Sequence, residues 1–327
     1  MTTGVLITNL GTPDDATPAS LRRYLAEFLW DRRVVDMPRL KWWLILHGII
    51  LRVRPKRVAK AYQKVWTENG GPLLVISKRQ REAIEKRLAD KLGYKVPVAL
   101  GMRYGNPSIS SALESLRQQE VSKIIILPLF PQYSAATTGS TFDAVSQALQ
   151  QWRNIPDLTF INNYHNNPGY IEALANSIND KWKEGGRAER ILLSFHGLPQ
   201  RYHDAGDPYR DQCNATAIAL NKKLGLRDGQ LQVVFQSRFG KEEWLKPYTE
   251  ETLRLLPVEG INKIDIICPG FSADCVETLE EIAMQDRDLF IGSGGESYQY
   301  IPALNNRHDH IDALTDILLA NWGENRV

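Results

Sequence analysis

The stretch Ile124–Phe130 reads IIILPLF, and it decides the fold class. Its four leading apolar residues are typical of a strand that is buried on both faces of a parallel sheet. Similar runs recur along the chain, at Val5–Asn9, Val96–Arg103, Leu158–Tyr164, Ile191–Phe195, Gln232–Ser237 and Ile264–Cys268. Helical patterns lie between them, at Lys78–Leu92, Ser110–Gln119, Phe142–Trp152, Tyr170–Lys183, Asp211–Leu224 and Ala273–Met284. This alternation predicts an α/β fold with doubly wound parallel sheets.

Three short landmarks occur in the same order in both halves of the chain. They are LGTP at 10–13 and HGLP at 196–199, MRYG at 102–105 and SRFG at 237–240, and LPLF at 127–130 and CPGF at 268–271. The repetition predicts two similar α/β domains that arose by internal duplication. We expect the first domain over residues 1–155, with an inserted lip at about 28–60, and the second over residues 156–305. A C-terminal helix is expected over residues 306–327, where it could pack back on the first domain.

Composition narrows the class of protein. The 327 residues are 43% hydrophobic and 24% charged, which is ordinary for a globular protein, and the net charge of +2 argues against a nucleic-acid partner. Three cysteines are too few for a disulfide framework or for a four-thiolate iron–sulfur cluster. The N-terminus does not resemble a signal peptide, and the longest apolar run, Trp42–Leu51, is too short to span a bilayer. We therefore expect a cytoplasmic protein.

One histidine and two glutamates are the candidate chemical groups. His196 stands at the end of a buried strand, where an imidazole can exchange protons near neutral pH or simply bond to a neighbouring backbone group. Glu277 and Glu281 are four residues apart and share one face of the predicted helix, as functional acids or as solvated ones. Glu280 points elsewhere and is expected to be solvated. Together the three groups suggest a divalent-metal site or a proton-transfer site.

Two further segments have open interpretations. The hydroxyl-rich loop Thr137–Thr141 could hold an anion at a helix N-terminus, or form an N-cap around Ser140 or Thr141. The Trp42–Leu51 run has basic flanks, so it could admit a large flat ligand, touch a membrane surface, or be a buried core helix. The sequence has no nucleotide-binding glycine motif and no serine-hydrolase elbow.

The segment LLSFHGLP at 192–199 resembles the signature of the ferrochelatase family. The resemblance continues over nearly the whole chain in the family's order. It includes ITNLGTPDD at 7–15, FLWDRRVVDMP at 28–38, MRYGNPSI at 102–109, LPLFPQYSAATTGS at 127–140, FQSRFGKEEWLKP at 235–247 and CPGFSADCVETLEEI at 268–282.

The resemblance implies insertion of Fe²⁺ into protoporphyrin IX to form protohaem, with release of two protons, as the last step of haem biosynthesis. It implies two Rossmann-like domains, with doubly wound parallel sheets, and a porphyrin bound in the cleft between them. By similarity His196 and Glu277 are catalytic, and His196, Glu277 and Glu281 contact the metal. The porphyrin-contacting positions implied in the same way are Leu10, Trp30, Arg32, Arg103, Tyr104, Tyr133, Ser134 and Trp244.

Cys275 is a departure, because many relatives have histidine there. The expected partners are protoporphyrin IX and Fe²⁺ as substrates, with no required cofactor and no iron–sulfur cluster. We expect a monomer, with a possible peripheral membrane contact through residues 40–57. Alternative functions are a chelatase for another tetrapyrrole or metal, such as coproporphyrin or sirohydrochlorin, and a non-catalytic porphyrin or haem carrier.

Overall fold

The computed structural model describes residues 2–323, and the chain divides into two compact units. Unit 1 contains the chain up to Phe130, then Ser134–Asn163 and the residues from Leu314 onward, and unit 2 contains Pro131–Tyr133 and Tyr164–Ala313. The expected boundary after residue 155 is therefore too early. Strand β4 (Asp157–Phe160) pairs with β3 (Lys123–Pro128), so its backbone hydrogen bonds keep this segment in unit 1.

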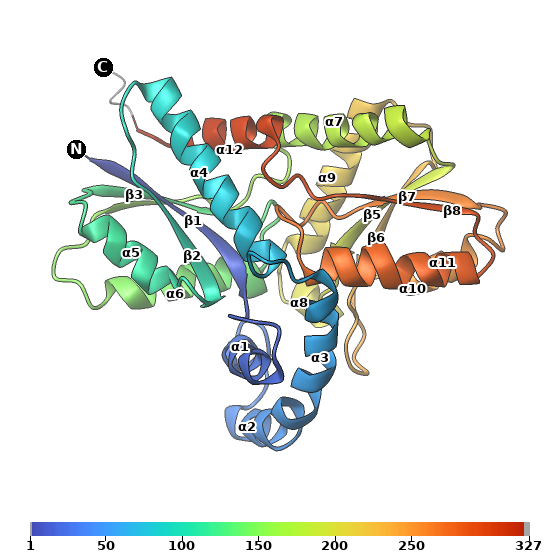
Figure 1. Ribbon diagram of the computed structural model, residues 1–327, viewed down its shortest axis with the longest axis horizontal. Coiled ribbons are helices and arrows are strands. Elements are labelled where there is room, and N and C mark those ends of the chain that lie inside the picture. The colour runs from blue at the N-terminus through green and yellow to red at the C-terminus, as the bar shows by residue number, and fades with distance from the viewer. Residues whose placement is uncertain (1, 324–327) are drawn as a thin grey trace. The chain divides into compact units, whose positions relative to one another are not determined.

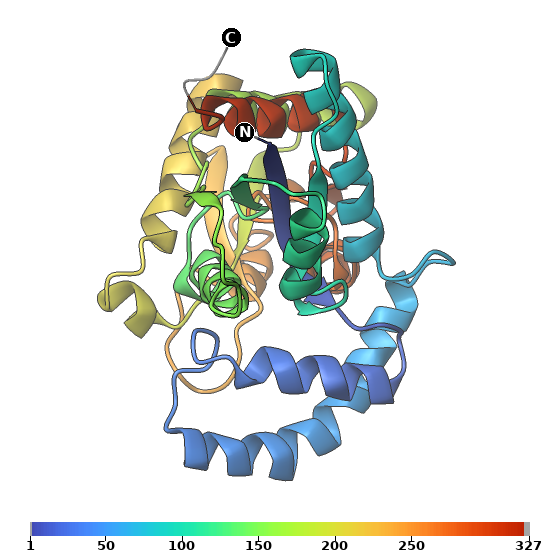
Figure 2. The same cartoon turned by 90° about the vertical axis from the view of Figure 1, so that its left-hand side faces the viewer.

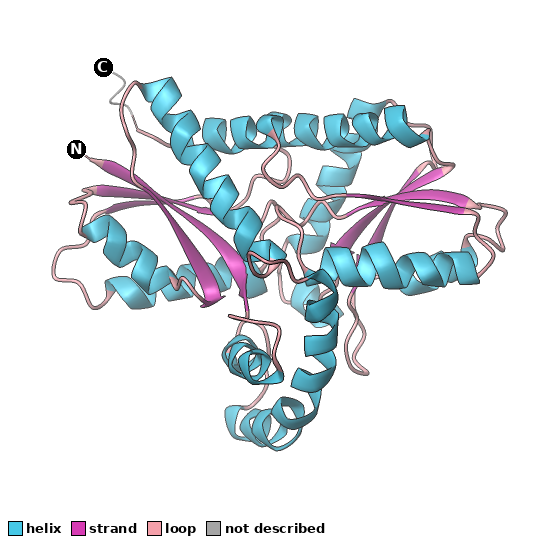
Figure 3. Ribbon diagram, viewed as in Figure 1, coloured by secondary structure: helices cyan, strands magenta, loops and turns pink. Residues whose placement is uncertain are grey.

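Each unit contains a sheet of four parallel strands, shown in magenta in Figure 3. In unit 1, β1 (Thr3–Thr12) lies between β2 (Val98–Gly105) and β3, which gives the order β2-β1-β3-β4. In unit 2, β5 (Arg190–His196) lies between β6 (Leu231–Gln236) and β7 (Lys263–Ile267), and β8 (Ser297–Ile301) completes the order β6-β5-β7-β8. The two orders correspond strand for strand. The predicted α/β fold with a repeated parallel sheet is confirmed.

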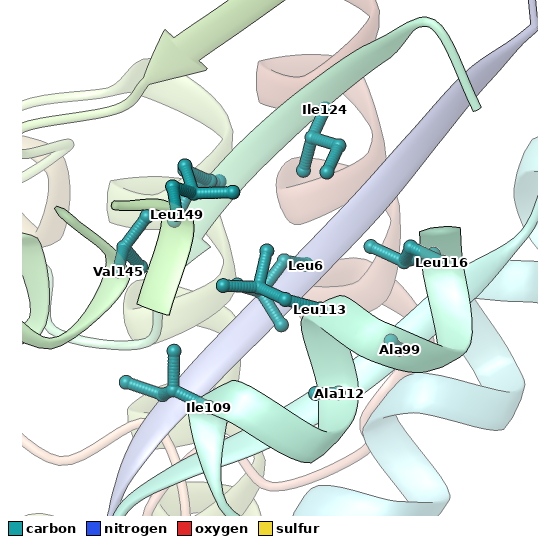
Figure 4. Close-up of a cluster of buried hydrophobic side chains, with 10 residues drawn as sticks. Leu6, Ala99, Ile109, Ala112, Leu113, Leu116, Ile124, Val145 and Leu149 are labelled. Carbon is teal, nitrogen blue, oxygen red and sulfur yellow. The ribbon is translucent and has the colours of Figure 1, made fainter. Parts of the chain in front are cut away.

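Helices cover both faces of the sheet in unit 1 (Figure 1). Helix α5 (Ile109–Arg117) packs on β1 and β2 and contacts α6 (Ser140–Leu149), while α4 (Pro72–Leu92) covers the other face. Figure 4 shows the core beneath α5, where Leu6 of β1, Leu113 of α5 and Ile124 of β3 are fully buried. Burial of these apolar side chains stabilises the packing of α5 on the sheet.

Four helical segments of unit 1 follow β1 and precede α4. They are α1 (Pro18–Trp30), α2 (Arg39–Ile45), the π-helix η1 (Leu46–Ile50) and α3 (Leu51–Val65), and Figure 2 shows them in blue beyond the carboxyl end of β1. Helix α1 begins with Thr17 as N-cap and Pro18 in its first turn, which is a favourable start. Helices were not expected at α1 or α3, because the strand–helix alternation breaks in this insertion.

The apolar run Trp42–Leu51 has two different faces. Trp42, Leu46 and Leu51 are buried against unit 1, whereas Trp43 and Ile49 are largely exposed. The interpretation as a buried core helix is therefore wrong for most of the run, since only three of its ten residues are buried. Its exposed half is an apolar surface of the lip.

Unit 2 follows the same plan. Its helices are α7 (Pro168–Gly185), α8 (Gln200–Asp204), α9 (Tyr209–Leu224), α10 (Thr249–Leu255), the π-helix η3 (Glu277–Asp286) and α11 (Arg287–Gly292). Helix α12 (His308–Ala320) starts in unit 2 and ends in unit 1; it is shorter than the expected 306–327, whose last four residues lie outside the described chain. None of the helices in residues 2–323 has both the length and the apolarity that a membrane crossing requires.

Candidate functional site

His196 is the last residue of β5, and its side chain is half-buried. The imidazole Nδ1 lies 2.7 Å from the carbonyl oxygen of Gly197. A carbonyl oxygen only accepts hydrogen bonds, so Nδ1 carries the proton of the neutral ring and Nε2 has a free lone pair. The local backbone therefore presents Nε2 as a proton acceptor or a metal ligand. The backbone bond, which was the alternative interpretation of His196, serves here to select the tautomer.

Glu281 is held by the residue that follows β6. Its Oε1 accepts the backbone N–H of Ser237 at 2.9 Å, and its Oε2 accepts the Ser237 hydroxyl at 2.6 Å. Ser237 has a φ of 62°, an uncommon left-handed conformation for a residue with a side chain, and one often found at functional sites. Burial raises the pKa of Glu281, the bonds from Ser237 and the nearby charge of His196 counteract it, and Glu277 raises it further. Glu281 is thus electrostatically linked to both other predicted chemical residues.

The helix that carries the two acids is a π-helix, whereas an α-helix was expected over Ala273–Met284. A π-helix has hydrogen bonds from residue i to residue i+5. Such turns are rare in proteins, and those that occur are often found at functional sites. Glu277 is its first residue and is half-buried. Glu280 is a correction: it is only 4% exposed, and its carboxylate accepts the Gln285 amide at 2.5 Å, so it is not solvated.

A buried carboxylate fixes the start of this π-helix. Asp274 Oδ1 accepts the Thr278 hydroxyl at 2.9 Å and the Tyr300 hydroxyl at 2.5 Å, and its Oδ2 accepts the Asn305 amide at 2.7 Å. The Thr278 hydroxyl also accepts the backbone N–H of Cys275 at 3.0 Å. These bonds tie the first turn of η3 to β8 and to the segment that follows it. Asp274 therefore positions the backbone that carries Glu277.

Trp244 packs against Gly197, the residue that follows His196. A Cβ on Gly197 would be 3.0 Å from the indole Cε3 of Trp244 and 2.8 Å from the carbonyl oxygen of Gln236, so only glycine permits this packing. Pro199 and Trp244 also form an isolated β-bridge. The buried indole Nε1 has no hydrogen-bond partner within residues 2–323. The structure thus places the predicted Trp244 against the residue that follows the predicted base.

Metal binding by these side chains stays a prediction. Over the described part of the chain, no three His, Cys, Asp or Glu side chains form a group that could hold a metal ion by themselves. The three cysteines, Cys213, Cys268 and Cys275, are buried and free. Burial raises the pKa of each of the three thiols.

Unit 1 has a pocket of about 430 Å³ at the lip. It is lined by Ala26, Glu27, Trp30, Asp31, Trp43, His47 and Arg103. Trp30 is 41% exposed and Trp43 is 48% exposed, and indole faces suit a planar apolar ligand. The Arg39 guanidinium lies 3.6 Å above the Trp30 ring and donates to the Trp30 carbonyl oxygen at 2.5 Å, which holds that indole in place.

The polar side of this pocket is a hydrogen-bonded ion pair. Asp31 Oδ2 accepts Arg103 Nη2 at 2.5 Å, the Tyr104 hydroxyl at 2.8 Å and the Ser140 hydroxyl at 2.5 Å. Arg103 Nε also donates to the carbonyl oxygen and the hydroxyl of Ser140, at 3.0 and 2.6 Å. Tyr104 is fully buried, so its predicted porphyrin contact is not available to its ring in this conformation. Its hydroxyl serves the network around Asp31 instead.

The other predicted contacts are divided between the two units. In unit 1, Leu10 is half-buried near the end of β1, and Arg32 is exposed in the segment after α1. Ser134 is buried, and its hydroxyl accepts the backbone N–H of Ala136 at 3.2 Å, which caps the π-helix η2 (Ala135–Gly139). In unit 2, the Tyr133 backbone N–H donates to Gln212 at 2.7 Å.

The hydroxyl-rich loop differs from the expectation of an N-cap around Ser140 or Thr141. Ser134 provides the helix cap, not Ser140 or Thr141, because the helix begins earlier than its pattern indicated. Ser140 instead bonds to Asp31 and Arg103. Asp31, Ser140 and Ser237 are the site residues that sequence reasoning missed. Asp31 and Ser237 lay inside quoted motifs, but only the structure shows their distant partners.

Solved structures with the same fold define the class of protein. The chain aligns with "SirB from Bacillus subtilis with Fe3+" at a TM-score of 0.58 and 12% identity, over 98% of this chain and 95% of that one. It also aligns with CbiX, described as the terminal enzyme of sirohaem biosynthesis in denitrifying bacteria, at a TM-score of 0.52 and 15% identity, over 97% and 98% of the two chains. The fold is that of the chelatases, built from two similar α/β sheets.

Sequence comparison specifies the family within this class. The family model for Ferrochelatase matches residues 2–321. The chain is 56% identical to the ferrochelatase of Thioalkalivibrio sulfidiphilus, over 98% of this chain and 88% of that one, and 51% identical to the ferrochelatase of Pectobacterium atrosepticum, over 96% and 97%. The chain belongs to the ferrochelatase family. It is a metal-inserting enzyme of haem biosynthesis that acts on iron and a porphyrin, as the resemblance implied.

Proposed function

We propose that unit 2 carries the chemistry of Fe²⁺ insertion into protoporphyrin IX, with His196 Nε2 as acceptor of a pyrrole proton. The observation that carries this proposal is the 2.7 Å bond between His196 Nδ1 and the Gly197 carbonyl oxygen. This bond selects the tautomer whose Nε2 lone pair is free. It also fixes the ring, because donor and acceptor belong to adjacent residues at the end of a buried strand.

The reaction requires two proton removals for each metal that enters. The two pyrrole N–H bonds break, their electron pairs become Fe–N bonds, and two protons leave. Distortion of the flat macrocycle exposes the nitrogen lone pairs, and binding energy from remote parts of the substrate can support that distortion. We assign one proton to His196, and the approach of Fe²⁺ or removal of the second proton to Glu277 and Glu281.

Oxygen ligands suit this transient role. Carboxylate and imidazole ligands bind Fe²⁺ as N and O donors without holding it as firmly as a closed thiolate site. The Ser237 bonds fix Glu281, and Asp274 fixes the start of the helix that carries Glu277. We propose that both acids contact the metal as a substrate that passes through, and that no resident cofactor or iron–sulfur cluster takes part.

Unit 1 supplies a surface for the porphyrin. Trp30 and Trp43 of the lip pocket provide aromatic faces for a planar ring. Leu10, near the end of β1, provides a further apolar contact. For unit 2 taken by itself, we propose Tyr133 and Trp244 as porphyrin contacts. Arg32 is exposed and suits a propionate.

Anaerobic absorption spectroscopy with protoporphyrin IX and Fe²⁺ tests the proposal. His196→Ala should lower kcat by about 10²–10⁴-fold, the range for loss of a general base, while porphyrin binding stays measurable. His308→Ala removes an exposed imidazole at the start of α12 and should leave kcat unchanged. Unchanged turnover in His196→Ala would refute the assignment.

The same assay separates the alternative functions. A carrier would shift the porphyrin spectrum but form no haem, even with wild-type protein and excess Fe²⁺. A chelatase for a different tetrapyrrole would metallate coproporphyrin or sirohydrochlorin with a higher kcat/KM than protoporphyrin IX. Either result would replace protoporphyrin metallation as the proposed reaction.

We also propose a peripheral membrane contact by a cytoplasmic monomer. Leu44, Ile49 and Val53 are more than half exposed on the lip, and basic residues flank them at Arg52 and Lys56. Exposed apolar side chains beside cations favour an anionic membrane surface. Flotation with phosphatidylglycerol vesicles tests the contact: Ile49→Ser/Val53→Ser should reduce flotation, and equal flotation would contradict it. Sedimentation equilibrium tests the oligomeric state: a monomer should give the mass of one chain, and a larger mass would contradict the proposal.

A further inference from the structure

The lip pocket contains one permanent cation, and that cation is already paired. Among the residues of the described chain that line the pocket, Arg103 is the only arginine or lysine. Its Nη2 lies 2.5 Å from Asp31, its Nε bonds to Ser140, and its Cζ lies 4.5 Å from the centroid of the Tyr104 ring. The side chains of Arg103 and Asp31 are only 19% and 8% exposed, so solvent screens this pair weakly.

Asp31 is ionised, and both of its carboxylate oxygens accept hydrogen bonds from neighbouring residues. Burial acts to raise the pKa of Asp31, but hydrogen bonds from Ser140, the Arg33 backbone and Tyr104, with the charge of Arg103, outweigh it and lower the pKa. Three donors reach Oδ2, and the Arg33 N–H reaches Oδ1 at 2.7 Å. A ligand therefore meets a neutralised pair on the polar side of the pocket. The rest of the lining is two indoles, Ala26, His47 and the further carboxylate of Glu27, so among the described residues it contains no second arginine or lysine.

An anionic group would bind poorly beside this pair. A carboxylate that entered would lose water and would face Asp31 at short range, where like charges repel. A porphyrin with two propionates on one edge has an opposite edge of uncharged methyl and vinyl groups. A tetracarboxylate porphyrin has propionates on both edges. Whichever edge enters the pocket, it therefore carries a charged propionate.

Resting on the proposed function, we infer that Asp31 is a specificity-determining residue: by neutralising Arg103, it makes the lip pocket accept the uncharged edge of a dicarboxylate porphyrin and reject a tetracarboxylate one. Asp31 acts through Arg103 and needs no contact with substrate. The same arginine without its partner would be a buried cation, which is a strong carboxylate ligand.

Asp31→Asn tests this inference, because asparagine keeps the size of the side chain and removes its charge. The measurements are Kd by porphyrin fluorescence and kcat/KM with iron, for coproporphyrin III and for protoporphyrin IX. The freed guanidinium should bind a coproporphyrin propionate. Relative to protoporphyrin IX, the Kd of coproporphyrin III should fall and its kcat/KM should rise, each by about 10-fold or more, as expected for one charge-assisted hydrogen bond. Asp31→Asn/Arg103→Gln removes the freed cation and should abolish the gain.

Asp143→Asn is the matched control. Asp143 binds Arg33 on the same loop with two bonds of 2.7 and 3.0 Å, but it does not line the pocket. Its substitution should leave the preference between porphyrins unchanged. An equal change of preference in this control would attribute the effect to loop disorder and overturn the inference. An unchanged preference in folded Asp31→Asn, or equal tightening of both porphyrins, would also overturn it.

Trp43→Arg covers the case in which Asp31→Asn does not fold. Trp43 is half exposed, so a cation can be placed at the rim without breaking the core. It should shift the preference towards coproporphyrin, and an unchanged preference would overturn the inference. Trp43→Ala separates this failure from failure of the porphyrin site itself. If Trp43→Ala weakens binding but no variant changes the preference, only the role of Asp31 is wrong; if it leaves binding unchanged, the site proposed in unit 1 is wrong.

Discussion

The two sheets have the same strand order, yet their central strands end differently. Leu10 lies near the end of β1 in unit 1, and His196 is the last residue of β5 in unit 2. The two positions correspond, since each directly precedes a Gly-x-Pro sequence that begins at Gly11 or Gly197. After this point unit 1 inserts α1, α2, η1 and α3 before α4, whereas unit 2 continues through α8 and α9 to β6. The difference indicates how a duplicated scaffold specialises: one copy keeps an ionisable side chain at its central strand, and the other gains a ligand surface.

Alanine at the two corresponding glycines should have the largest effect. A Cβ on Gly11 would be 1.8 Å from the Tyr104 carbonyl oxygen at a φ of +114°, whereas one on Gly197 would be 2.8 Å from that of Gln236. Gly11→Ala should therefore cost about 3–5 kcal/mol of unfolding free energy or prevent folding, and Gly197→Ala about 1–3 kcal/mol. Urea unfolding measures both. Gly48→Ala, with open space around its Cβ among the described residues, is the control, and equal costs at Gly11 and Gly197 would contradict the predicted difference between the two units.

Ser237→Ala tests the chemistry of unit 2 without touching its base. The variant removes the 2.6 Å hydroxyl bond to Glu281 and leaves the backbone bond. Loss of one hydrogen bond to a charged group should lower kcat/KM by about 10-fold. Ser293→Ala removes a hydroxyl bond to the Leu289 carbonyl oxygen in α11 and should leave activity unchanged. Wild-type activity in Ser237→Ala would show that Glu281 needs no such support.

Asp286→Asn should remove a pH dependence that distinguishes the two units. Burial, with the charges of Glu281 and Glu250, raises the pKa of Asp286 to about 8, whereas the pKa of Asp31 in unit 1 is lowered. Between about pH 4 and 8 folded Asp286 holds a proton that the unfolded chain has released, so its contribution to stability is lost as pH rises. The contribution of Asp31 has the opposite sign and is lost as pH falls.

The amide that replaces the Asp286 carboxyl does not titrate, so the variant should gain about 1–3 kcal/mol over wild type between about pH 5 and pH 9. Chemical unfolding across that range measures the difference. Asp288→Asn, an exposed substitution on the adjoining helix α11, is the control and should parallel wild type. A difference between Asp286→Asn and wild type that stays constant with pH would contradict the prediction.

Trp43→Ala should have the smallest effect. The indole is half exposed, so its removal should weaken protoporphyrin binding by about 3–10-fold without changing stability. Leu44→Ala removes a neighbouring exposed apolar side chain that does not line the pocket. Titration of porphyrin fluorescence compares the two variants, and equal weakening would mean that general apolarity matters more than the pocket.

The sequence predicts most of the sheet because buried parallel strands are continuous apolar runs. Strand β8 was missed, because SYQYI is an edge strand that pairs only with β7 and is mostly half-buried, so it has no such run. The helix after β7 was expected with α-helical bonding and is a π-helix. Its bonding depends on contacts such as that of Asp274 with Tyr300, which no local pattern contains.

Site residues were predictable where position alone indicates function. His196 ends a strand, and Glu277 and Glu281 share a helix face. The spacing of these residues along the sequence was therefore enough to predict them as candidates. Asp31 and Ser237 act through partners far along the chain: Asp31 through Arg103 and Ser140, 72 and 109 residues away, and Ser237 through Glu281, 44 residues away. Neither residue differs locally from a solvated loop residue, so only the tertiary structure could assign them.

The Asp31 network has a consequence for the order of folding. One carboxylate joins the end of α1, strand β2 and the start of α6, so it closes long loops whose entropic cost precedes any gain from the bonds. The lip pocket must therefore mature late, after the segment containing Ser140 has docked. Porphyrin fluorescence during refolding should lag behind the recovery of helix and strand. During synthesis, a ribosome-bound chain that ends before α6 should have its first strands but no finished substrate pocket.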